Sequence, residues 1–163
     1  MLEAYLDIET TGLNPFSCQI TVVGIYLTGE GQDEVIQLVG DKVNPDSLLG
    51  ALGGVRTLHT YNGSRFDLPF IDVHHRVDLA NRFRHVDLMY DCWRKNLYGG
   101  LKVVERQLGI SRRVKDVNGY EAVRLWWAYV YDHDDAALKK LLEYNREDVV
   151  NLKTLKAKLG GSA

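Results

Sequence analysis

A long amphipathic segment near the C-terminus most constrains the fold, because it needs an apolar surface along its whole length. Between Asp135 and Leu159, side chains three and four residues apart share one helical face. They are Leu138, Leu141, Asn145, Asp148, Leu152, Leu155 and Leu159. Two polar residues, Asn145 and Asp148, interrupt this leucine stripe. A carboxylate on the buried face of a helix is costly without a compensating partner, so the segment predicts both a helix and a site.

The N-terminal segment, residues 2–8, predicts a strand that ends in two carboxylates. Its apolar residues recur at every second position, so alternate side chains point to opposite faces. Asp7 and Glu9 therefore share one face, just before a Thr-Thr-Gly sequence ends the strand. An exposed strand end is the alternative for this pair, and the Asp-x-Glu spacing alone does not decide between the two.

The rest of the chain predicts an α/β domain. Strands are expected over residues 19–28, 34–39, 56–60 and 85–88, with a turn over residues 29–33. Helices are expected over residues 45–52 and 68–76, and from residue 89 onward with breaks at 99–100 and 111–119. Because three strands come first and strands then alternate with helices, we expect a mixed sheet covered by helices. We expect one domain over residues 1–159 and a flexible tail over 160–163.

The composition is that of a folded domain without a membrane partner. With 163 residues, of which 45% are hydrophobic, the chain can bury a full core. No apolar stretch approaches the roughly 20 residues that cross a bilayer, and the first residues have no basic start and apolar run, so we expect no secretion signal. Cys18 and Cys92 have no metal-type spacing and are expected to be free thiols, which is typical of a reducing cytoplasm.

The net charge of −2 conceals a basic middle segment. Residues 52–115 carry twelve Lys or Arg and six Asp or Glu, whereas residues 1–51 carry one basic and eight acidic residues. A local basic patch is enough to attract phosphates, although a solvated surface of mixed charge is the alternative. The side chains that could guide a nucleic-acid strand are Arg65, Arg82, Arg84, Arg94, Lys95, Lys102, Arg112 and Arg113.

Two further motifs carry residues that could belong to a functional site or could have structural roles alone. Asp67 precedes the expected helix at 68–76, where it could also act as a helix cap, and Asn62 could be a turn residue. Phe66 could stack on a base or lie in the core. Tyr144 lies one helical turn before Asp148, although it could be an ordinary surface aromatic.

Four carboxylates distributed over three distant motifs make sense together only if the fold gathers them. They are Asp7, Glu9, Asp67 and Asp148. Gathered carboxylates repel one another, and bound divalent metal ions usually compensate their negative charge. Two such ions a few ångströms apart suit phosphodiester cleavage.

In combination, these motifs resemble the DEDD superfamily of 3′–5′ exonucleases, which have a ribonuclease-H-like fold. The matching stretches are Asp7-Ile-Glu9-Thr10-Thr11-Gly12, the run from Tyr61 to Phe70, and Tyr144 with Asp148. Glu143 stands where the histidine branch has its histidine, so the tyrosine branch, DEDDy, fits better. Proofreading domains of family B DNA polymerases are similar, as are stand-alone prokaryotic domains predicted to be exonucleases. The latter also resemble this chain over residues 85–88 and 100–105.

The resemblance implies a fold, a site and a reaction. The fold is an α/β domain whose mixed sheet has about five strands with helices on both faces. Asp7, Glu9, Asp67 and Asp148 would hold two divalent ions, Mg²⁺ or Mn²⁺, and Tyr144 would orient the attacking water. The expected substrate-binding residues are Thr10, Asn62, Phe66 and Lys102. The expected reaction, with a possible role in DNA repair, removes 5′-mononucleotides from the 3′ ends of single-stranded DNA or RNA.

Two other functions stay open at this point. The same fold supports structure-selective endonucleases, including ribonucleases, and it also supports non-catalytic modules that bind nucleic acid. A non-catalytic module should have lost at least one metal ligand, whereas all four acids and the tyrosine are present. The sequence does not distinguish DNA from RNA, because recognition of the 2′-hydroxyl depends on details of the pocket, and it identifies no protein partner.

Overall fold

A mixed five-stranded sheet runs through the centre of the computed structural model, which describes residues 1–160. The strands are β1 (Leu2–Thr10), β2 (Ile20–Gly29), β3 (Gln32–Val39), β4 (Val55–Thr60) and β5 (Arg84–Asp87). Their spatial order is β3-β2-β1-β4-β5. The two pairs β1–β2 and β2–β3 are antiparallel, whereas β1–β4 and β4–β5 are parallel. The mixed five-stranded sheet expected from the sequence is therefore confirmed.

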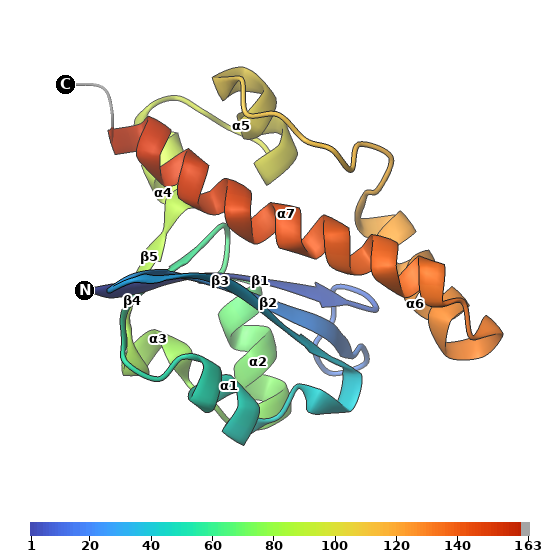
Figure 1. Cartoon of the computed structure of the whole chain (residues 1–163). Helices are drawn as coiled ribbons and strands as arrows, with labels where there is room; N and C mark the ends of the chain where they lie inside the picture. The colour runs from blue at the N-terminus through green and yellow to red at the C-terminus, as the bar shows by residue number, and fades with distance from the viewer. Residues whose placement is uncertain (161–163) are drawn as a thin grey trace.

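Helices cover both faces of this sheet (Figure 1). The first group is α1 (Pro45–Ala51), α2 (Asp67–His75) and α3 (Leu79–Arg82), and a 3-10 turn, η1 (Gly40–Lys42), precedes it. The second group is α4 (Leu88–Arg94), α5 (Leu101–Leu108), α6 (Gly119–Asp132) and α7 (Asp135–Gly160). The first group lies on one face and the second on the other, with α7 running along the sheet (Figure 1). None of the helices within residues 1–160 combines the length and the apolar character needed to cross a bilayer.

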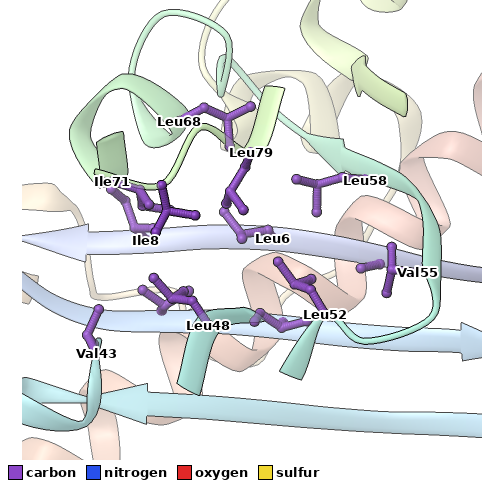
Figure 2. Close-up of a cluster of buried hydrophobic side chains, with 14 of the residues drawn as sticks. Leu6, Ile8, Val43, Leu48, Leu52, Val55, Leu58, Leu68, Ile71 and Leu79 are labelled. Carbon is purple, nitrogen blue, oxygen red and sulfur yellow. The ribbon is translucent and has the colours of Figure 1, made fainter. Parts of the chain in front are cut away.

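The alternation of β1 directs its two sets of side chains to different layers. Leu6 and Ile8 point into a buried cluster with residues of α1, α2 and α3, including Leu48 and Ile71 (Figure 2). Tyr5, on the opposite face, belongs to a second cluster formed with α4, α5 and α7. Because side chains alternate along a strand, Asp7 and Glu9 share this second face and point toward α7.

Three local features differ from the sequence-based expectation. The turn expected over residues 29–33 is shorter, because Gly29 already pairs with Gln32. Glu30 and Gly31 alone connect the strands, and both have positive φ angles, as tight hairpin turns require. The short helix α3 was not predicted, because four residues are too few to show a helical period. Gly160 is the last residue of α7, and the rest of the expected tail, residues 161–163, lies outside the described residues.

Asn145 interrupts the leucine stripe of α7 because the helix meets the sheet there. Its side chain is fully buried, and its Nδ2 donates to the carbonyl oxygen of Asp7 at 3.2 Å. Its Oδ1 accepts from Nε2 of Gln37 at 3.0 Å. Gly24 pairs with Asp7 in the adjacent strand, and a Cβ there would lie 2.2 Å from Oδ1 of Asn145. The absence of a side chain at Gly24 therefore lets α7 approach the sheet beside Asp7.

We expect Gly24→Ala to destabilise the protein, because the added methyl group collides with the buried Asn145 amide. Overpacking of this kind costs about 1–3 kcal/mol of the free energy of unfolding, which urea denaturation measures. Gly50→Ala is the matched control, because a Cβ at this position in α1 meets no atom within 4 Å. Equal stabilities for the two variants would contradict the close contact between Gly24 and Asn145.

Candidate active site

Three of the four predicted metal ligands meet where the end of β1 faces α7. Asp7, Glu9 and Asp148 each place one carboxylate oxygen within 4.8 Å of the others. Glu9 and Asp148 are buried and Asp7 is partly buried. The first and last motifs, which are far apart in sequence, therefore converge on one site.

Asp67 joins the site through the backbone of β1. Its Oδ2 accepts a hydrogen bond at 3.0 Å from the N–H of Ile8, the residue between Asp7 and Glu9. Asp67 is the first residue of α2, and the N-cap residue Phe66 makes no side-chain capping bond. The middle motif is thus tied to the strand that carries the first motif, and Asp67 does more than begin a helix.

Asp87, at the end of β5, shapes the turn that leads to Asp67. Its carboxylate accepts from the N–H groups of Asn62 and Ser64 at 2.8 and 3.1 Å, and from the Ser64 hydroxyl at 2.6 Å. Asn62 has a φ of 60°, and a Cβ at Gly63 would lie 2.2 Å from Oγ1 of Thr60. No role was predicted for Asp87 from the sequence, although its position at the carboxyl end of β5, next to β4, indicates one.

Burial of like charges raises the pKa values of the gathered carboxyl groups. Burial and the neighbouring Asp148 raise the pKa values of Asp7 and Glu9 well above their ordinary range. Burial raises the pKa of Asp67 to about 7, although the Ile8 N–H opposes the change. Burial also raises the pKa of Asp148 to about 6, against the lowering effect of Arg112. Such a cluster is strained when fully ionised, and a cation would relieve the repulsion.

The chemistry of the site fits Mg²⁺ or Mn²⁺. The three gathered donors are all carboxylate oxygens, which hard divalent cations prefer, and neither thiolate nor imidazole belongs to this group. The raised pKa values of Asp7 and Glu9 indicate negative charge that the protein alone does not compensate. These observations support a divalent metal site.

Tyr144 forms one wall of a cavity beside the carboxylates. The cavity has a volume of about 280 Å³, and its lining includes Asp7, Tyr61, Leu101, Lys102, Arg112, Tyr144 and Asp148. The Nζ of Lys102 lies 4.4 Å from the centre of the Tyr144 ring, and Cζ of Arg112 lies 5.6 Å from it. Burial and the charge of Asp148 raise the pKa of the Tyr144 hydroxyl above its ordinary range, so it stays protonated at neutral pH.

Two of the other predicted substrate contacts, Thr10 and Phe66, have local structural partners. The Thr10 hydroxyl donates to the carbonyl of Gly12 at 2.6 Å, within the loop after β1. Phe66 packs against Phe70 with ring centres 5.4 Å apart and lies against the buried cluster, so it contributes to the core. Oδ1 of Asn62 is buried and has no hydrogen-bond partner within residues 1–160. The substrate-binding roles of these residues stay predictions.

Arg112, one of the basic side chains predicted as candidates for guiding a strand, is mostly buried. Its side chain is only 8% exposed, and its guanidinium contacts the carboxylates of Asp148 and Glu105. The loop between α5 and α6 folds back against α7, where Glu147 accepts from the N–H groups of Arg113 and Val114. The sequence around Arg112 has no periodicity that signals burial, so only the tertiary structure reveals this contact.

The sheet topology and the carboxylates gathered at the end of β1 define an α/β domain with a candidate metal site. A family model described as RNase_H superfamily (RNase_H_2) matches residues 4–160. The chain therefore belongs to the ribonuclease H superfamily, and the predicted ribonuclease-H-like fold is confirmed.

Three known proteins are similar over most of the chain. The uncharacterized protein MJ0365 of Methanocaldococcus jannaschii is 29% identical over 168 residues, which cover 91% of this chain and 90% of that protein. The family B DNA polymerase of Pyrobaculum calidifontis has a TM-score of 0.75 at 16% identity, over 98% of this chain and 24% of the polymerase chain. NrnC of Brucella melitensis with bound Mg²⁺ has a TM-score of 0.64 at 25% identity, over 98% of this chain and 72% of NrnC. This chain thus spans about a quarter of the polymerase.

We expect the carboxylate cluster to make the metal-free protein less stable as the pH rises. Burial raises the pKa of Asp67 in the folded state from 3.8 to about 7, so the folded chain binds more protons than the unfolded chain over this interval. The free energy of unfolding therefore falls between about pH 4 and pH 7. Added Mg²⁺ should raise the melting temperature more at pH 8 than at pH 5, which thermal unfolding with EDTA or Mg²⁺ measures.

The variant Asp67→Asn isolates this effect, because an amide keeps an acceptor for the Ile8 N–H but does not ionise. The decline in stability with pH should be smaller in Asp67→Asn than in the wild type. The control Asp46→Asn changes an exposed carboxylate of α1 and should keep the wild-type dependence. An unchanged pH dependence in Asp67→Asn would contradict the raised pKa.

Proposed function

We propose that the protein is a metal-dependent 3′–5′ exonuclease that acts on single-stranded nucleic acid and releases 5′-mononucleotides. One observation carries this proposal: oxygens of Asp7, Glu9 and Asp148 lie within 4.8 Å of one another. Asp67 lies beside them through its hydrogen bond to β1. NrnC, which is 25% identical, has been solved with bound Mg²⁺, and this supports the choice of metal.

Four carboxylates would hold the two divalent ions, Mg²⁺ or Mn²⁺. They are Asp7, Glu9, Asp67 and Asp148. When bound, such ions would lower the pKa of a water that serves as the nucleophile, and they would supply positive charge near the phosphate and the leaving oxygen. The protein contributes a fixed arrangement of ligands, because β1 and α7 are rigid elements joined by the Asn145 contacts.

Tyr144 is suited to orient the attacking water. Its raised pKa keeps the hydroxyl protonated, so it can donate or accept a hydrogen bond but cannot act as a general base at neutral pH. Lys102 lies over the same ring and lines the same cavity, so its ammonium can attract a phosphate there. Thr10, Asn62 and Phe66 complete the proposed contacts with the terminal nucleotide.

The proposed substrate is the 3′ end of a single strand of DNA or RNA. NrnC has also been solved bound to pGG, which is consistent with a short single-stranded ligand on this fold. We also propose that the enzyme is cytoplasmic, because Cys18 and Cys92 are free thiols, which are typical of a reducing compartment. A role in DNA repair stays a prediction.

We expect Asp7→Asn and Asp148→Asn each to reduce cleavage of a single-stranded oligonucleotide by at least about a thousandfold. Loss of metal-based stabilisation costs several kcal/mol in the transition state, and each 1.36 kcal/mol is about a factor of ten. Cleavage rates with Mg²⁺ or Mn²⁺ measure this effect. The control Asp46→Asn, on the opposite face of the sheet, should keep wild-type rates. Wild-type activity in either site variant would show that cleavage occurs elsewhere.

The polarity of cleavage is tested with a blocked 3′ end. An exonuclease that starts at this end should shorten a 5′-labelled single strand one nucleotide at a time, and a 3′-terminal blocking group should stop it. DNA and RNA strands of the same sequence, digested side by side with and without Mn²⁺, report the preferred sugar and the metal requirement. Rapid internal cutting of the blocked strand would instead support an endonuclease.

A further inference from the structure

A buried ion pair beside the carboxylate cluster has no role in the proposed function so far. Arg112 and Glu105 have side chains that are 8% and 1% exposed. Nε of Arg112 lies 3.0 Å from each carboxylate oxygen of Glu105, and Nη2 lies 2.9 Å from Oε1. The same Nη2 donates to Oδ1 of Asp148. One nitrogen of the guanidinium thus contacts both the buried Glu105 and a proposed metal ligand.

The position of this guanidinium is fixed from several directions. Nδ2 of Asn151 donates to Oε2 of Glu105 at 2.6 Å, one helical turn after Asp148 on α7. Glu147 binds the backbone on the C-terminal side of Arg112, through the N–H groups of Arg113 and Val114. Helix α5, the loop after it and helix α7 are therefore joined around Arg112.

Glu105 determines how Arg112 acts on the site. A free guanidinium would compete with a metal ion for Asp148, because both carry positive charge. Glu105 compensates the charge of Arg112 at close range, so Asp148 meets a nearly neutral pair with one well-directed N–H donor. A donor of this kind orients a carboxylate without replacing its metal, as hydrogen bonds to metal ligands commonly do.

We propose that Arg112, held by Glu105, is the positioning residue of Asp148. It binds Oδ1 and restricts the rotation of the carboxylate, so that Asp148 would stay oriented to hold a divalent cation together with Asp7 and Glu9. This inference rests on the metal site of the proposed function. It also assigns a function to Glu105, which is not among the residues that line the cavity beside Tyr144 or among the three gathered carboxylates.

The test measures the affinity for Mn²⁺ by isothermal titration calorimetry without nucleic acid. Arg112→Lys keeps the positive charge but loses the planar fork that contacts both carboxylates. We expect it to weaken Mn²⁺ binding by about tenfold or more, the usual effect of removing a hydrogen-bond partner of a metal ligand. Arg113→Lys, an exposed neighbour, is the matched control and should bind Mn²⁺ with wild-type affinity.

A second variant keeps the proposal testable if Arg112→Lys does not fold. Glu105→Gln combined with Arg112→Met removes both charges of the buried pair and keeps an acceptor for Asn151, so neither member of the pair is left as an unpaired charge. Thermal unfolding without metal reports whether each variant folds. The double variant should also bind Mn²⁺ about tenfold more weakly than the wild type.

Unchanged or tighter Mn²⁺ binding in both Arg112 variants would overturn the positioning role, and tighter binding would identify Arg112 as a competitor of the metal. A wild-type protein that binds no Mn²⁺ would also overturn it. A different result would contradict the proposed function alone. If the wild type binds Mn²⁺ and Arg112→Lys weakens this binding, but no nucleic acid is cleaved, the positioning role is supported and the proposed exonuclease activity is contradicted.

Discussion

Repulsion between buried carboxylates is the constraint on which the rest of the structure depends. Folding buries Asp148 of α7 close to Asp7 and Glu9 of β1. Burial raises the pKa values of all three, and the charge of Asp148 raises those of Asp7 and Glu9 further. A fold selected only for stability would separate these charges. The contacts that bring α7 to the sheet must therefore offset the repulsion. Apolar side chains of the leucine stripe are buried in the clusters on this face of the sheet, and the amide of Asn145, which fits against Gly24, determines where the helix lies.

The scaffold also explains why the site lies at this edge of the sheet. Strands β1, β4 and β5 are parallel, so their carboxyl ends lie at the same edge of the sheet. Strands β1 and β5 carry acidic side chains of the site near these ends, and β4 is followed by the turn that leads to Asp67. Asp87 at the end of β5 holds the turn after β4, and that turn leads to Asp67. Buried clusters on both faces of the sheet keep these ends in place (Figure 2 shows one of them). The position of each carboxylate therefore follows from the core and not from a flexible loop.

Sequence patterns predicted the parts of this arrangement that depend on local periodicity. The alternation of β1 gave the shared face of Asp7 and Glu9, and the interrupted leucine stripe of α7 indicated that Asp148 is buried. Contacts between distant segments carry no such period. The hydrogen bond from Ile8 to Asp67 and the burial of Arg112 both depend on loops that fold back onto rigid elements. Helix α3 was missed because four residues show no pattern, and the burial of Arg112 was not predicted because arginine is usually exposed.

Direct location of a bound metal tests the central claim most closely. Crystals grown with Mn²⁺ should show an anomalous diffraction peak between the carboxylates of Asp7, Glu9 and Asp148, with the guanidinium of Arg112 still bound to Asp148. A Mn²⁺ peak at another place, or the absence of any peak at saturating Mn²⁺, would contradict the account. In that case, bound cations would not explain why the carboxylates are gathered.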